Sequence, residues 1–226
     1  MIVTRIVGRL MSALILCLLA SACGNANQDA SELIKKLPAA LASIGKKPQP
    51  TGVTPDQIDK ALAATRAPVA LFTAEARQNQ FLMLEIERNG AYRTFGSSSR
   101  QSITFLDGMM VATRGLGNDL MSSDAASLHG LVSARKNGSV RYALRFLSAE
   151  DKTTVHEFEC SVSPAVPVPV QAGQIDTTAQ SMIAVCRGED LSFSNVYAVD
   201  RSGRIVSARQ WMGDKTGYMT VQMLRY

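Results

Sequence analysis

The sequence lacks the short motifs that mark the common classes of active site. It contains no G-x-S-x-G nucleophile elbow, no H-E-x-x-H zinc motif and no glycine-rich phosphate loop. Histidine is scarce as well: His129 and His156 are the two in the chain, and neither has a cysteine or carboxylate cluster at metal-ligand spacing. We therefore interpret both histidines as non-catalytic, expect no metal and no dissociable cofactor, and predict that the protein is not an enzyme.

Charge gives no sign of a nucleic-acid partner. The formal net charge is +5, and no basic stripe is interleaved with aromatic residues. Glu85 and Glu87 share one face of a predicted strand, and paired carboxylates are also the catalytic groups of most glycosidases. Because Arg88 follows them closely, an exposed charged strand face explains them better than an acid–base pair.

The sequence also lacks an apolar run long enough for a typical membrane helix. The run near the N-terminus, Leu10–Leu19, is shorter than the ~20 residues that a spanning helix needs. Arg5 and Arg9 precede it and small residues follow it, which is the order found in a secretory signal. Cys23 comes next, and the arrangement resembles a bacterial lipobox, in which the peptidase cuts before the cysteine. We predict that residues 1–22 are a lipoprotein signal peptide; a plain secretory signal and an uncleaved helix are the alternatives.

A lipobox cysteine carries diacylglycerol on its thiol and an acyl chain on its new amino group, so Cys23 is the predicted lipidation site. Three acyl chains exceed the two membrane signals that stable anchoring requires. Gly24 stands where enterobacterial lipoproteins retained at the inner membrane tend to carry Asp. This favours an outer-membrane anchor facing the periplasm, with the membrane as the first predicted partner.

Four cysteines have three different expected fates. Cys17 leaves with the signal peptide and Cys23 takes lipid, so Cys160 and Cys186 remain in an oxidising compartment. One remaining pair allows one intramolecular connectivity, and we predict a Cys160–Cys186 disulfide. On the chain-entropy model such a bridge stabilises the fold by roughly 3 kcal/mol. Two buried, reduced cysteines are the alternative.

Residues 23–67 are predicted to form a lipidated tether followed by short helices. Apolar residues recur near a period of 3.6 over residues 31–44, where Pro38 should bend or break the helix. A second helix is predicted from Thr54, an N-cap with proline next in sequence, to about Thr65.

Residues 68–226 are predicted to form one antiparallel β domain. Apolar and polar residues alternate from Phe81 to Arg88, and this pattern recurs in about eleven short segments. Asn89-Gly90 and Asp107-Gly108 are two-residue hairpin signals, so consecutive strands should be antiparallel. A sheet of this length tends to curl or close. The predicted fold class is therefore all-β: an antiparallel meander that forms a barrel or strongly curved half-barrel, with short N-terminal helices.

Two segments interrupt this pattern. Ser163–Gly173 contains three prolines and is predicted to be an extended connection rather than a strand. Arg114–Asp124 matches neither a strand nor an ordinary turn. Together with Phe105–Gly108 and Val111–Thr113 before it, this segment resembles the YjbF family of exopolysaccharide-operon lipoproteins, which includes the lipoprotein of the group 4 capsule operon.

The resemblance extends from about Pro68 to the C-terminus. It implies an outer-membrane lipoprotein linked to the assembly or export of an extracellular or capsular polysaccharide. It implies no reaction, because the family has no established catalytic residues. The further matching positions are Cys160, Cys186–Gly188, Phe193–Tyr197, Ser207–Trp211 and Gly217-Tyr218.

Arg114 and Asp119 are the first candidate binding residues. In one interpretation they form an internal ion pair, while glycines supply unusual backbone angles and Leu116, Leu120 and Met121 close the end of the barrel. In the other, Arg114 is a donor fork for an acidic sugar or a partner protein, on a loop supported by a rigid barrel. The sequence leaves both interpretations open.

A second candidate group lies on two neighbouring strands near the C-terminus. Aromatic, amide and guanidinium side chains alternate there, and they suit sugar binding if both strand faces line one concavity. A packed core with a buried polar network is the alternative. The candidate residues are Asn195, Tyr197, Arg209 and Trp211.

The leading hypothesis is a lipid-anchored accessory protein in polysaccharide assembly or export, which binds glycan or export proteins rather than catalysing a reaction. A groove lined by Tyr197, Arg209 and Trp211 would favour glycan. One alternative is a β-barrel carrier of a lipid or acyl chain, which a filled interior would contradict. A glycan-modifying enzyme with an unrecognised site is another alternative. The carrier is suggested by methionines able to line an adaptable pocket, namely Met109, Met110, Met182, Met219 and Met223.

Overall fold

The computed structural model describes residues 52–147 and 152–226. The predicted signal peptide, Cys23 and the predicted helix over residues 31–44 lie outside the described residues. The chain divides into two units, and all described residues belong to the second, Pro50–Tyr226. Neither helix in the described part of the chain is both long and apolar enough to cross a membrane.

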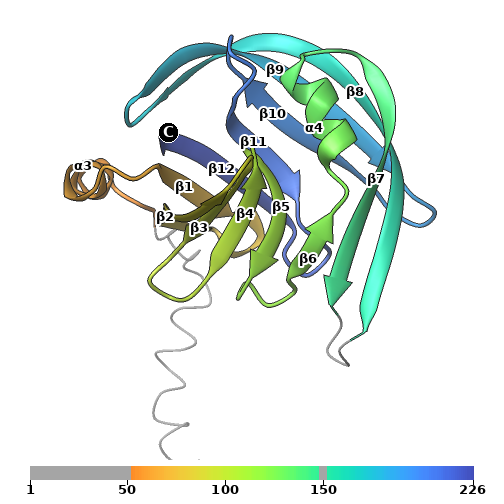
Figure 1. The fold of residues 1–226 in the computed structure, drawn as a ribbon, viewed down its shortest axis with the longest axis horizontal. Helices are drawn as coiled ribbons and strands as arrows, with labels where there is room; N and C mark the ends of the chain where they lie inside the picture. The colour runs from red at the N-terminus through yellow and green to blue at the C-terminus, as the bar shows by residue number, and fades with distance from the viewer. Residues whose placement is uncertain (1–51, 148–151) are drawn as a thin grey trace, which may run out of the picture. The chain divides into compact units, whose positions relative to one another are not determined.

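Twelve antiparallel strands form one sheet that curls into a nearly closed barrel (Figure 1). Pairing runs in order from β5 back to β1, from β1 to β12, and back again to β6. The edge strands β5 and β6 are consecutive in the chain and lie side by side without a backbone ladder. We call the gap between them the seam. The strands are β1 (Val69–Ala74), β2 (Asn79–Asn89), β3 (Tyr92–Gly96), β4 (Ser102–Leu106), β5 (Met109–Arg114), β6 (Leu120–Ser123), β7 (Gly138–Leu147), β8 (Thr153–Ala172), β9 (Ile175–Arg187), β10 (Ser192–Val199), β11 (Ile205–Trp211) and β12 (Tyr218–Arg225).

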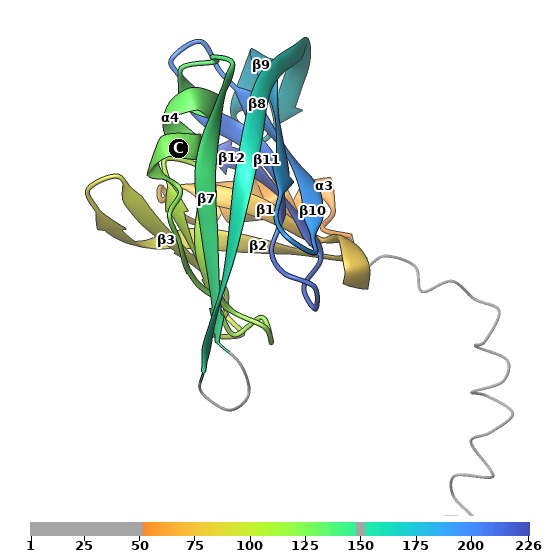
Figure 2. The ribbon, with the colours of Figure 1, turned by 90° about the vertical axis from the view of Figure 1, so that its right-hand side faces the viewer.

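The predicted all-β, antiparallel barrel is confirmed, and turn chemistry explains its meander. Gly90 has a φ of 61° in the β2–β3 turn, and Asp107 and Gly108 have φ values of 43° and 96° in the β4–β5 turn. Aspartate and glycine tolerate this left-handed region, which two-residue hairpin loops use. The β2–β3 loop is Gly90-Ala91, one residue later than the predicted Asn89-Gly90 pair, because Asn89 ends β2 and pairs with Tyr92 of β3. In Figure 2 the neighbouring strands β7 and β8 run side by side along the front of the barrel.

Two short helices accompany the sheet in the described part of the chain. Helix α3 (Pro55–Ala64) starts at Thr54, whose side chain forms a capping box with Gln57, as the sequence predicts. Helix α4 (Ala126–Ser133) is not predicted from the sequence; it buries Leu128 and Val132 in the core and contacts β7, β8 and β10. A single 3-10 turn, η1 (Glu75–Arg77), links β1 to β2.

Two predictions about the strands are wrong. Ser163–Gly173 is not an extended connection, because β8 continues to Ala172 and pairs with β9 along this length. Strand β7 pairs with β8 only as far as Val162, so the prolines beyond that point forfeit no hydrogen bond to β7. Arg114–Asp124 does contain a strand, since Leu120–Ser123 forms β6 and pairs with β7.

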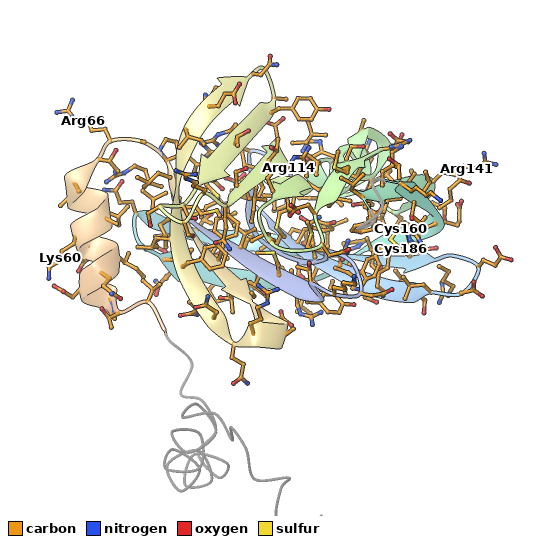
Figure 3. All side chains as sticks on the ribbon, turned by 90° about the horizontal axis from the view of Figure 1, so that it is seen from below. Lys60, Arg66, Arg114, Arg141, Cys160 and Cys186 are labelled. Atoms are coloured by element: carbon orange, nitrogen blue, oxygen red, sulfur yellow. A yellow bond between two sulfur atoms is a disulfide. The ribbon has the colours of Figure 1, made fainter. Side chains whose placement is uncertain are left out.

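A disulfide joins Cys160 on β8 to Cys186 on β9, which are direct cross-strand partners (Figure 3). Both residues are fully buried. The predicted pairing is therefore present, and it cross-links β8 and β9 on the side of the barrel away from β1.

Side chains fill the interior of the barrel. The ring of Phe105 contacts the rings of Phe72 and Phe95, with centroids 5.8 and 5.3 Å apart. Because an acyl chain needs open space, this packing counts against the lipid-carrier alternative. The methionines that suggested the carrier all lie buried in the same hydrophobic cluster: Met109, Met110, Met182, Met219 and Met223.

Candidate functional site

An open groove of about 710 Å³ lies at the end of the barrel where β5 leads into β6. Residues around three connections meet there: β5 to β6, β7 to β8 and β11 to β12. The topology dictates this meeting, because every second connection of an antiparallel meander returns to the same end. The lining residues are Arg114, Gly117, Asn118, Asp119, Met121, Phe146, Leu147, Thr154, His156, Trp211, Gly213, Asp214 and Lys215.

Side chains join β5 to β6 across the seam. The N–H of Leu120 donates to Thr113 Oγ1 at 2.9 Å, and the hydroxyl of Ser123 donates to the carbonyl oxygen of Val111 at 3.3 Å. Arg114 Nη1 donates to the carbonyl oxygen of Leu120 at 3.1 Å. Since Arg114 also lines the groove, the seam forms part of the groove wall.

Asp119 fixes the loop between β5 and β6. Its carboxylate accepts hydrogen bonds from the N–H groups of Gly115 (2.7 Å) and Leu116 (3.0 Å) and from the hydroxyl of Thr113 (3.2 Å). Gly115 has a φ of 76°, which glycine adopts without steric cost and which lets the loop fold back over the carboxylate. The described chain therefore contains no Arg114–Asp119 ion pair, because Asp119 turns to its own loop.

Arg114 is exposed, and its guanidinium is held by backbone carbonyl oxygens. Nη1 donates to Thr113 at 2.6 Å as well as to Leu120, and Nη2 donates to Met121 at 3.3 Å. Figure 3, which looks at the barrel from the groove end, shows Arg114 near the centre and Arg141 projecting into solvent at the edge. Arg114 thus combines a structural role at the seam with a charge that faces the groove.

Aromatic side chains form the floor of the groove. The ring of Trp211 stacks on Phe193 at 4.8 Å between centroids and meets Phe146 edge-on at 6.1 Å. His156 also meets Phe146 edge-on, with ring centroids 5.8 Å apart. Trp211 is only 8% exposed, and among the described residues none accepts a hydrogen bond from its indole N–H, which is not sealed from solvent. A ligand in the groove would therefore find an apolar surface with one free donor.

The loop between β11 and β12 forms another part of the groove rim. Gly213 has a φ of 101°, and a Cβ there would lie 2.7 Å from Cε1 of Phe146 and 3.0 Å from Nδ2 of Asn118. This close approach brings the β11–β12 loop against the β5–β6 loop. Asp214 and Lys215, which follow Gly213, are exposed at the surface. Neither of these charged side chains forms an ion pair with a described residue.

Asn195 and Tyr197 lie inside the core rather than in the groove. Both are fully buried. Asn195 accepts a hydrogen bond from the backbone N–H of Trp211 at 2.8 Å and donates to the hydroxyl of Tyr197 at 3.3 Å. Burial raises the pKa of Tyr197 well above its ordinary value. These two candidates belong to the buried polar network that the sequence allowed, and Asn195 supports the backbone beneath Trp211.

Arg209 lies on the outer surface of the barrel. It donates to both carboxylate oxygens of Glu75, at 2.8 and 2.7 Å, and its guanidinium lies 3.5 Å above the ring centre of Tyr218. Strand β11 alternates between buried and partly buried residues from Val206 to Gln210, but Gln210 and Trp211 are both buried, so Trp211 turns inward while Arg209 stays outside. Of the four candidates near the C-terminus, the groove therefore contains Trp211 alone, and it joins Arg114 and Asp119 there.

Several groove residues escape sequence reasoning. His156 stands without a cysteine or carboxylate cluster in the sequence, and Phe146, Asp214 and Lys215 belong to no motif. One signal was available: the connections after β5, β7 and β11 must share one end of a meander. Counting strands would have placed Lys215 at the same end of the barrel as Arg114.

Comparison with known proteins identifies the family. Among solved structures, the chain is similar to the crystal structure of the hypothetical lipoprotein YmcC from Escherichia coli (K12), with a TM-score of 0.66 and 12% identity. This likeness covers 75% of this chain and 89% of that chain, and it shows a shared fold. No match is found among curated proteins. The profile described as "Group 4 capsule polysaccharide lipoprotein gfcB, YjbF" matches residues 30–224, and because this match spans most of the sequence, the chain belongs to the YjbF family.

Proposed function

We propose that this protein is a lipid-anchored component of the cell envelope that binds polysaccharide during its assembly or export. The observation that carries the proposal is the groove at the seam end of the barrel, where an aromatic floor lies beside free hydrogen-bond donors. Membership of a family described as capsule polysaccharide lipoproteins supports a glycan as the ligand and the envelope as the location.

The composition of the groove suits a sugar chain. Phe146 and Trp211 offer apolar surface against which the C–H face of a sugar ring can pack. Asn118, Thr154 and Arg114 place amide, hydroxyl and guanidinium groups around that surface, where they can pair with sugar hydroxyls. Because the groove is open rather than enclosed, a polymer can lie across it without presenting a chain end.

The two carboxylates of the groove support binding rather than catalysis. Most glycosidases use a pair of carboxylic groups, one as acid and the other as base or nucleophile, on either side of the scissile bond. Asp119 accepts three hydrogen bonds from its own loop and its neighbour Thr113, and so serves as a structural acceptor. Asp214 then has no free carboxylate partner among the described lining residues.

Lipidation at Cys23 completes the proposal: cleavage after residue 22, diacylglycerol and an N-acyl chain on the cysteine, and an outer-membrane anchor facing the periplasm. Radiolabelled palmitate should enter the wild-type protein, and the label should be lost in Cys23→Ser. In density-gradient fractionation the labelled protein should move with the outer membrane. An unlabelled wild-type protein would exclude the anchor.

Glycan binding is tested by calorimetric titration of the full-length lipoprotein in detergent with fragments of the host's own polysaccharide. Trp211 is the single tryptophan of the chain and lines the groove, so its emission gives an independent readout. His156→Ala should weaken binding roughly fivefold, the equivalent of about 1 kcal/mol. Val155→Ala, which alters the neighbouring side chain on the outer face, should leave binding unchanged. Absence of both heat and emission change in the wild type would contradict glycan binding and redirect the search to a protein partner.

A further inference from the structure

Arg114 presents free donors to the groove in a fixed orientation. A guanidinium carries five N–H groups, and Arg114 uses three of them in hydrogen bonds to the carbonyl oxygens of Thr113, Leu120 and Met121. These bonds hold the guanidinium plane in place. The Nε–H and one further N–H have no acceptor within residues 52–147 and 152–226. Arg114 is therefore a cation in a fixed position, and its two remaining N–H groups are available to a ligand.

Two more donors in the same groove are free. Lys215 is exposed, and no described carboxylate lies within salt-bridge distance of it. An ammonium group offers three donors and no acceptor. The indole N–H of Trp211 likewise has no acceptor in the described chain. These groups come from β5, β11 and the loop after β11, so two separate parts of the chain contribute donors to the groove.

The groove has fewer free anionic groups than free cationic groups. The formal charges of Arg114 and Lys215 are matched in number by Asp119 and Asp214. However, Asp119 accepts from two backbone N–H groups and a hydroxyl, which stabilise its charge within the loop. Asp214 is left as the one carboxylate, among the described lining residues, that has no protein donor. A ligand consequently meets two free cations and one free anion.

We propose that the groove prefers an acidic glycan, with a sugar carboxylate accepting hydrogen bonds from Arg114 and Lys215. This inference rests on the proposed glycan-binding function and names the class of sugar. A guanidinium edge with two parallel N–H groups matches the two oxygens of a carboxylate. Charge-assisted hydrogen bonds of this kind are stronger than those to a neutral sugar hydroxyl, so a uronic acid gains more from these donors than a neutral hexose.

The test compares two oligosaccharides of equal length on the full-length lipoprotein in detergent. Tetragalacturonate supplies four carboxylates and maltotetraose supplies none. At low ionic strength, tetragalacturonate should bind roughly tenfold more tightly, measured by calorimetry and by Trp211 emission. The difference should shrink as salt is added, because partly exposed ion pairs are screened.

Two variants on the β11–β12 loop should change the affinity for tetragalacturonate in opposite directions. Lys215→Gln should weaken tetragalacturonate binding roughly fivefold and maltotetraose binding by less, so that the ratio of the two affinities falls. Asp214→Asn should strengthen tetragalacturonate binding by removing the free anion. Lys136→Gln, which makes the same charge change on an exposed residue after α4, is the matched control and should change neither.

The outcomes separate this inference from the proposed function. Equal affinity for the two sugars, or variants that shift both sugars alike, would overturn the acidic preference and leave glycan binding standing. Failure of both tetrasaccharides and of the host polysaccharide fragments to bind would instead overturn glycan binding itself. Opposite shifts in Lys215→Gln and Asp214→Asn would establish the preference.

Discussion

The side-chain amide of Gln210, on β11, pairs with both backbone polar groups of Met110, on β5. The N–H of Met110 donates to Oε1 of Gln210 at 2.8 Å, and Nε2 donates back to the carbonyl oxygen of Met110 at 3.2 Å. Gln210 is fully buried. Because β5 is an edge strand, these groups would otherwise be unpaired inside the barrel. The Gln210 side chain therefore supplies the hydrogen-bond partners that the backbone of Met110 lacks at this edge of the sheet.

Replacement of Gln210 by leucine should destabilise the barrel by roughly 2–4 kcal/mol, because two buried backbone groups lose their partner. Urea unfolding followed by Trp211 fluorescence measures the change. Gln171→Leu removes an exposed glutamine from β8 and should cost less than about 0.5 kcal/mol. Similar losses in the two variants would show that the Gln210–Met110 pair is not a special requirement of the fold.

Arg114→Ala should loosen the seam, since it removes the hydrogen bonds to the carbonyl oxygens of Leu120 and Met121. We expect amide exchange at Leu120 to accelerate about fivefold, the effect of roughly 1 kcal/mol on local opening. Hydrogen exchange resolved by residue measures this. Arg141→Ala, which removes the arginine that projects into solvent in Figure 3, is the control. Unchanged exchange at Leu120 would show that Thr113 and Ser123 hold the seam without Arg114.

Local chemistry made much of the fold predictable. Several features depend on residues close in sequence: the cap at Thr54, the hairpin at Asp107-Gly108, the hairpin one residue beyond the predicted Asn89-Gly90 pair, and the alternation of the strands. Cys160 and Cys186 could be paired because they were the cysteines left over for an oxidising compartment. Antiparallel order then followed from short turns.

Features that depend on distant contacts were not predictable. In β2 the alternation predicts a strand, but the structure turns Met83 inward and leaves Leu84 and Ile86 37% and 65% exposed. Ile86 lies over Gly96 of β3, an arrangement that β2 alone does not encode. The Gln210–Met110 pair spans 100 residues. Within the groove, Arg114 and Trp211 were both singled out from the sequence, but only the closed sheet shows that they share one site.

Glu75 should make the stability of the barrel depend on acidic pH. Hydrogen bonds from Arg209 lower the pKa of Glu75 below its usual value near 4.5. A carboxylate with a lowered pKa in the folded state stabilises the fold above its unfolded pKa, and this stabilisation is lost as the pH falls through the folded-state pKa. Glu75→Gln should therefore be less stable than wild type at neutral pH, and the difference should shrink below about pH 4.5.

Urea unfolding at a series of pH values measures the difference in unfolding free energy between wild type and Glu75→Gln. Glu87→Gln is the control, because Glu87 is exposed and forms no ion pair with a described residue. A difference that stays constant between neutral and acidic pH would show that Glu75 acts through packing of η1 rather than through its charge.

Gly213→Ala should distort the groove and destabilise the protein. The new Cβ would lie 2.7 Å from Cε1 of Phe146, and the φ of 101° is strained for any residue with a side chain. We expect a loss of roughly 1–3 kcal/mol in the free energy of unfolding, together with a shift in Trp211 emission as Phe146 moves.

The matched control is Gly130→Ala in α4, where nothing lies within 4 Å of the added Cβ. Alanine there should be neutral or stabilise the protein by up to about 1 kcal/mol, because alanine has a higher helix propensity than glycine. Equal stability of Gly213→Ala and wild type would mean that the β11–β12 loop can move away from Phe146, and the groove would then be adjustable rather than fixed.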